Sequence, residues 1–186
     1  MTRGSCTELD TNNMQGYKIT KYDLSWYGEA GSYRKDEWTS LSDVGETFNG
    51  VEFTTAEYEN VENSYLAAIK IFAGSAGIDR LRVCDVEIRD DNPKWRLRNG
   101  QYVSLSFAVE ICREMLREGT IWCRLEEGED FYVHIGYDYY MYIGVNASAD
   151  LRRAVHSVRQ LGLFVQENWL SPYLGEESAQ EERDGP

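Results

Sequence analysis

The sequence predicts a single α+β domain in which about three helices pack against a largely antiparallel sheet. Three segments place apolar residues at steps of three and four, which is typical of amphipathic helices. Other segments alternate apolar and polar residues, which is typical of half-buried strands. The chain has 186 residues, enough for one sizeable core. We expect the domain to span residues 16–174, between a disordered leader, 1–15, and a disordered acidic tail, 175–186.

The first strand is expected at residues 17–22, where apolar and polar residues alternate. Residues 35–40 are expected to form a short strand or a strand edge. The first helix follows a capping-box pattern, in which Thr54 and Glu57 satisfy each other's backbone amide groups. Gly74 is expected to end that helix, because glycine readily takes the conformation that follows a last helical turn.

A second strand and a second helix are expected in the middle of the chain. The alternation over residues 78–89 changes phase near Cys84, which indicates a bulge or burial of both strand faces. Ser104 or Ser106 would cap the second helix, and Gly119 would end it.

The densest run of strand-forming residues spans 120–144 and predicts a β-hairpin followed by a third strand. Its first two strands flank a glycine-containing acidic loop, which we expect at 127–129. A third helix is expected at 149–161, and Leu163 would begin a last strand.

The register of this hairpin follows from the alternation of its residues. A three-residue loop places Leu125 opposite Phe131, and a slip by one residue would pair apolar with polar side chains. The other face then carries Trp122, Tyr132 and His134, so it is aromatic and amphipathic. We expect either a layer of helices or a partner to cover that face.

Composition limits the classes of partner. The net charge is −13 and the isoelectric point is about 4.6, which argues against a nucleic-acid or anionic-membrane surface and favours a basic partner. The N-terminal residues contain no apolar segment typical of a signal peptide, and no apolar run approaches the roughly 20 residues of a membrane span. We therefore expect a cytoplasmic protein.

The four cysteines are too far apart in sequence for a C-x-x-C motif, which excludes the usual zinc-knuckle and thioredoxin patterns. Cys112 and Cys123 fall on predicted core faces. We expect Cys84, Cys112 and Cys123 to be free thiols in a reducing compartment.

No catalytic, cofactor or metal motif is recognisable. His134 and His156 are the two histidines, and neither stands in a known metal-ligand or nucleophile motif. The hairpin loop gathers four acids without the spacing of a calcium loop: Glu126, Glu127, Glu129 and Asp130. These acids are best interpreted as a solvated tip, next as a protein-contact patch, and only then as a metal site.

Several segments resemble an uncharacterised bacterial family. They are Tyr17–Tyr22 (YKITKY), Asp36–Gly45 (DEWTS-x-SD-x-G), Phe48–Gly50 (F-x-G), the tyrosine-rich first helix, and Gly136–Tyr142 (GYDYYMY). Small acidic, aromatic-rich α+β proteins of this kind resemble the immunity partners of bacterial polymorphic toxins. The resemblance implies a binding protein and no catalytic residues.

The first functional hypothesis is therefore an immunity protein that neutralises a basic toxin domain, for example a nuclease. Complementary charge would speed association, and aromatic side chains would supply buried contact area. The expected partner surface is the hairpin tip with its aromatic face, made of Glu126, Glu127, Glu129, Asp130, Trp122, Tyr132, His134, Tyr137 and Tyr140. A second, weaker candidate surface is made of Asp36, Glu37 and Trp38.

Two alternatives from other classes stay open. One is a hydrolase that uses Asp36, Glu37 or His134. The other is a ligand-sensing domain whose pocket is lined by Tyr132, Tyr137 and Tyr140. A large apolar pocket with convergent polar groups would favour either alternative, and an acidic aromatic surface would favour the binding protein.

Overall fold

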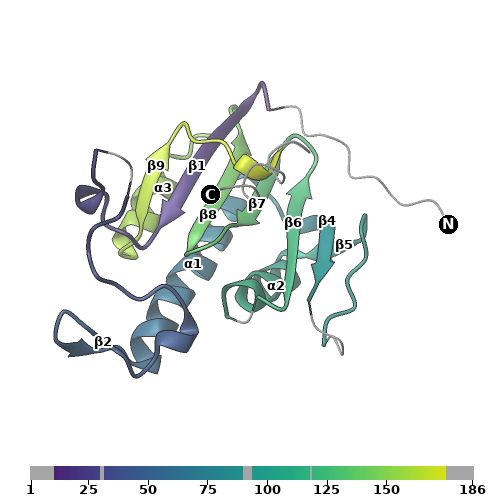
Figure 1. Cartoon of the computed structure of the whole chain (residues 1–186). Helices are drawn as coiled ribbons and strands as arrows, with labels where there is room; N and C mark the ends of the chain where they lie inside the picture. The colour runs from purple at the N-terminus through teal and green to yellow at the C-terminus, as the bar shows by residue number, and fades with distance from the viewer. Residues whose placement is uncertain (1–10, 30–31, 90–93, 118, 175–186) are drawn as a thin grey trace.

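The computed structural model describes residues 11–29, 32–89, 94–117 and 119–174. Over these residues, a seven-stranded antiparallel sheet carries three helices on one face, as Figure 1 shows. The predicted α+β class is thus confirmed. The segments 1–10 and 175–186, most of the predicted leader and the whole predicted tail, lie outside the described residues.

The sheet has the strand order β5-β4-β6-β7-β8-β1-β9. In chain order its strands are β1 (Met14–Thr20), β4 (Arg80–Ile88), β5 (Tyr102–Ser104), β6 (Ile121–Glu127), β7 (Phe131–Ile135), β8 (Tyr140–Asn146) and β9 (Phe164–Glu167). A separate two-stranded hairpin is formed by β2 (Thr47–Phe48) and β3 (Val51–Glu52). The helices are α1 (Thr55–Ser75), α2 (Leu105–Arg117) and α3 (Arg152–Gln160), and short 3-10 turns lie at Leu24–Trp26, Leu41–Asp43 and Pro172–Leu174.

The predicted helix caps are present. The Thr54 side chain accepts a hydrogen bond from the Glu57 amide at 3.2 Å, and the Glu57 carboxylate accepts one from the Thr54 amide at 2.9 Å. Ser104 caps α2, because its hydroxyl accepts a hydrogen bond from the amide of Phe107. Among the described residues, no helix is long and apolar enough to cross a membrane.

Two predicted strand positions were wrong. The first strand begins at Met14 rather than at residue 17, so the end of the predicted leader belongs to the sheet. Residues 35–40 form no strand, because this segment crosses the helix-bearing side of the molecule, where Trp38 is buried. A bulge does interrupt β4 between Cys84 and Glu87, as the change of phase predicted.

The register of the β6–β7 hairpin differs from the prediction by two residues. Leu125 pairs with Val133, and Glu127 pairs with Phe131. Gly128 therefore opens the loop at a φ of +51°, a conformation that glycine adopts without strain. A shift by two residues preserves the alternation, so each side chain still lies on its predicted face.

The two faces of the sheet are covered differently. The helices bury an apolar face, and Leu125, Phe131 and Val133 are completely inaccessible there. Residues 168–174, which we call the C-terminal strap, contact the other face through Ser171 and Tyr173. The chain's own C-terminal strap thus lies over part of the aromatic face, a cover that the expectation of helices or a partner did not include.

The expectation of three free thiols was also wrong. Cys112 and Cys123 are buried free cysteines, as predicted. Cys84 is disulfide-bonded. Disulfides are typical of oxidising compartments, so the argument from free thiols to a reducing compartment no longer holds.

Candidate functional site

The aromatic face of the hairpin is largely inaccessible. Tyr132 and His134 are both fully buried. The Ser171 hydroxyl lies 2.8 Å from Nδ1 of His134, and the Ser171 amide donates to the Tyr132 hydroxyl at 3.1 Å. The C-terminal strap already occupies these polar groups, so Tyr132 and His134 do not belong to an exposed partner surface.

Glu126 is also buried and belongs to an ionic cluster instead of the solvated tip. Its carboxylate lies 3.3 Å from Nη1 of Arg124, 3.4 Å from Nε2 of His134 and 4.0 Å from Nη2 of Arg82. The bulge in β4 places Asp85 beside the same arginine, with 2.7 Å between the Asp85 carboxylate and Nη2 of Arg124. These neighbours compensate the charge of Glu126, so it is not free to bind a basic partner.

The rest of the tip offers little uncompensated charge. Glu127 is half-buried and lies 3.6 Å from Nη2 of Arg80. Glu129 and Asp130 are exposed. Only these two of the four predicted acids thus present exposed carboxylates.

The other predicted aromatic residues are not gathered at one site. Trp122 is half-buried, and its indole donates to the carbonyl of Ile135 at 2.8 Å. Tyr140 is half-buried and its hydroxyl lies 2.5 Å from that of Tyr27. Tyr137 is 62% exposed in the turn between β7 and β8. The pocket predicted for Tyr132, Tyr137 and Tyr140 is therefore not formed by these residues.

Ser171, His134 and Glu126 make a chain of contacts that resembles the relay of a serine hydrolase. However, the serine contacts Nδ1 and the carboxylate faces Nε2, the reverse of the usual arrangement. All three residues are buried, so a substrate has no access to the hydroxyl. Burial also lowers the pKa of His134, which favours a neutral imidazole. The cluster is best explained as a structural anchor for the C-terminal strap.

The second predicted surface forms a groove, which we call the acidic groove. Its volume is about 410 Å³, and it is lined by Lys35, Asp36, Glu37, Trp38, Phe48, Asn49, Val51, Glu52, Phe53, Glu57, Asn60 and Val61. The lining comes from the segment before the β2–β3 hairpin, from that hairpin, and from the first turns of α1. Figure 1 shows this hairpin at the lower left, at the opposite end of the view from the β6–β7 turn.

The groove has an aromatic floor. Trp38 stacks on Phe53 with 4.4 Å between ring centroids, and Phe48 meets Phe53 edge-on at 6.2 Å. Val51 is 64% exposed at the rim. The floor is therefore fixed by ring packing, and the rim offers an apolar contact.

Carboxylates surround this floor with little compensation. Asp36 and Glu52 are exposed and make no ion pair within 4 Å among the described residues. Glu57 is exposed but caps α1, and Glu37 is held between Lys21 and Lys35, each 3.8 Å away. Hence Asp36 and Glu52 are the groove carboxylates most available to an external cation.

A signal in the sequence marks this region. Residues 36–69 contain eight acidic residues and no lysine or arginine, within a chain whose net charge is −13. Asp36, Glu37 and Trp38 were predicted from the sequence, whereas Phe48, Val51 and Glu52 were not, although this run without basic residues contains all six.

Lys21 lies directly behind the floor. Its ammonium group sits 4.0 Å from the centre of the Trp38 ring and 4.1 Å from that of Tyr22. Burial lowers the pKa of Lys21 to about 8, although the nearby carboxylate of Glu37 opposes this shift. Trp38 and Glu37 thus already hold one cation inside the molecule, by ring contact and charge.

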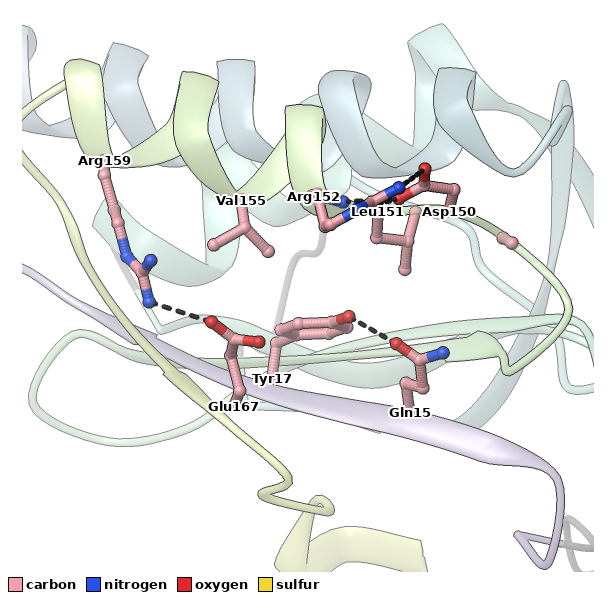
Figure 2. A pocket seen from close by; sticks show the side chains of 9 residues that line it. Gln15, Tyr17, Asp150, Leu151, Arg152, Val155, Arg159 and Glu167 are labelled. Carbon is pink, nitrogen blue, oxygen red and sulfur yellow. Dashed lines mark hydrogen bonds and ion pairs between the residues drawn. The ribbon is translucent and has the colours of Figure 1, made fainter.

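Another cavity, of about 360 Å³, lies between α3 and the strands β1 and β9. Figure 2 shows two ion pairs at its opposite ends, Arg159 with Glu167 and Arg152 with Asp150, and the Tyr17 ring between them. The Tyr17 hydroxyl donates to the side chain of Gln15 at 2.8 Å. Because these polar groups satisfy one another, they do not converge on a ligand.

No group of three or more histidine, cysteine, aspartate or glutamate side chains that could hold a metal ion was found within the described parts of the chain. Comparison of the chain with models of protein families, with curated proteins and with solved structures found no match.

Proposed function

We propose that this chain is a binding protein that acts as an immunity protein, neutralising a basic toxin domain, for example a nuclease, through its acidic groove. One observation carries the proposal: the longest run without basic residues, 36–69, lines a groove that has an aromatic floor. A catalytic role is not part of the proposal.

The chemistry of the groove suits such a partner. A nuclease site is electropositive because it must attract phosphate, so exposed carboxylates would speed its association with this chain. Asp36 and Glu52 supply that charge, and Val51 with the rings below it supplies apolar area. Aromatic anchors are a common source of affinity in protein interfaces.

The proposal is tested by growth. The gene immediately upstream of the one for this chain encodes the toxin candidate. The C-terminal domain of that upstream gene product is expressed in a bacterial host, alone and together with the chain. We expect the domain alone to stop growth and co-expression to restore it. The double variant Asp36→Lys/Glu52→Lys should fail to restore growth, whereas Glu129→Lys/Asp130→Lys, which changes net charge equally at the hairpin tip, should restore it.

Equal protection by both double variants would overturn the role of the groove. An upstream domain that is harmless, or that stays toxic with the wild-type chain, would overturn the immunity function itself. Both variants replace exposed side chains, so melting temperatures within a few degrees of wild type provide the folding control.

A further inference from the structure

A small cavity, which we call the ring pocket, lies where β6 begins and β7 ends. Its volume is about 150 Å³, and it is lined by Thr39, Ser40, Arg89, Met115, Leu116, Gly119, Ile121, Trp122, Ile135, Gly136, Tyr137, Asp138 and Tyr139. None of these residues lines the acidic groove, so this site is independent of the proposed function.

The inner wall of the ring pocket is apolar and rigidly held. Met115, Leu116, Ile121 and Ile135 are each at most 8% exposed. Apolar cavities of about 150 Å³ in protein cores accept a single benzene ring. The volume and the wall together therefore fit a ligand with one six-membered ring.

The turn that closes the pocket adopts an unusual backbone conformation. Asp138 and Tyr139 both have positive φ, at +51° and +61°, and the Tyr140 amide donates to the Tyr137 carbonyl at 3.1 Å. This type of turn favours Asn-Gly, because side chains rarely adopt positive φ. The Tyr139 hydroxyl donates to the Leu116 carbonyl at 3.0 Å, which keeps its ring in the pocket wall. Such conformations concentrate at ligand sites.

The charges at the rim do not favour an ionic ligand. Arg89 lies 3.1 Å from the Glu87 carboxylate, and Asp138 adds a negative charge on the same rim. An anion would meet both carboxylates, and a cation would meet the guanidinium. The hydroxyl groups of Tyr137, Thr39 and Ser40 are neutral polar groups of the lining, and that of Ser40 already contacts Ser42 and Asp43.

We propose that the ring pocket binds a small neutral aromatic compound with one hydroxyl group, of the phenol class. The ring packs against the buried aliphatic wall and the Tyr139 ring. The ligand hydroxyl points to the rim, where it exchanges hydrogen bonds with Tyr137 or Thr39.

The full chain is titrated with phenol, and binding is monitored through the methyl NMR signals of Ile121 and Ile135. We expect saturable shifts of both signals. Benzoate and benzylammonium, which have a similar ring but carry charge, should bind at least about tenfold more weakly. Comparable binding of either ion would overturn the assignment of ligand class.

Two variants locate the site. Thr39→Trp places a large side chain at the mouth and should abolish the saturable shifts, whereas Thr47→Trp, at an exposed position outside the pocket, should leave them unchanged. Met115→Phe fills the pocket from the helix side and should also abolish binding, which provides a second test if the first variant does not fold. Shifts that never saturate, or that are equal in Thr39→Trp and Thr47→Trp, would overturn the proposal.

Discussion

The hairpin tip and the acidic groove both gather carboxylates, but they differ in what lies beside them. At the tip, Arg124 compensates the charge of Glu126, and Arg80 compensates that of Glu127. In the groove, Asp36 and Glu52 have no such cation within 4 Å among the described residues. Glu129 and Asp130 at the tip are equally exposed and also make no ion pair within 4 Å among the described residues, so what sets the groove apart is the aromatic floor beside its free carboxylates.

The largest effect on stability should come from Glu126. Replacing it by alanine leaves Arg124 and Arg82 partly uncompensated, and breaking a buried ion pair on one side costs about 3 kcal/mol or more. Glu129→Ala, three residues further along, should change the free energy of unfolding by less than about 0.5 kcal/mol. Urea denaturation measures both. Similar losses in the two variants would contradict the division of the tip into buried and exposed acids.

A second effect concerns pH at the same cluster. Because burial lowers the pKa of His134 below its ordinary 6.5, the folded state binds its proton less readily than the unfolded state. The contribution of neutral His134 to the free energy of unfolding is therefore present above pH 6.5 and is lost as the pH falls below that value. Urea midpoints at about pH 7.5 and about pH 5.5 should differ more for the wild type than for His134→Gln. An identical pH dependence in both proteins would show that His134 does not cause the loss of stability at low pH.

A smaller effect is expected behind the groove. The pKa of Lys21 is about 8 when folded and 10.5 in the unfolded reference, so between these values the folded state holds fewer protons. Stability from this group should therefore rise with pH across that window, by on the order of 1 kcal/mol between about pH 8 and about pH 9.5. Lys21→Met should remove this rise. If the variant keeps the same slope, Lys21 is not the group responsible.

Much of the fold followed from local patterns. The capping box at Thr54 and the bulge near Cys84 were predicted because both depend on neighbouring residues. The hairpin register was wrong by two residues because alternation fixes the face of a side chain but not its partner across the strands. The disulfide at Cys84 was not predicted, because local patterns do not show which cysteines meet in the fold.

The site was harder to predict than the fold. Alternation correctly separated Trp122, Tyr132 and His134 from the helix-facing core. It carried no information about the C-terminal strap, which lies more than thirty residues further along the chain. Conversely, Asp36 and Trp38 received less weight than the tip because residues 35–40 were expected to form only a short strand or a strand edge. The absence of lysine and arginine from residues 36–69 is the sequence signal that points to the groove.

The most direct test of the central claim compares the two surfaces with one probe. A basic peptide, Arg-Leu-Arg-Leu-Arg, is titrated into the chain while backbone amide NMR signals are recorded. We predict that the shifts gather at Phe48, Val51 and Glu52, that Asp36→Lys/Glu52→Lys removes them, and that Glu129→Lys/Asp130→Lys leaves them in place. Shifts that gather at the hairpin tip, or that disappear equally in both double variants, would contradict the assignment of the working surface to the acidic groove.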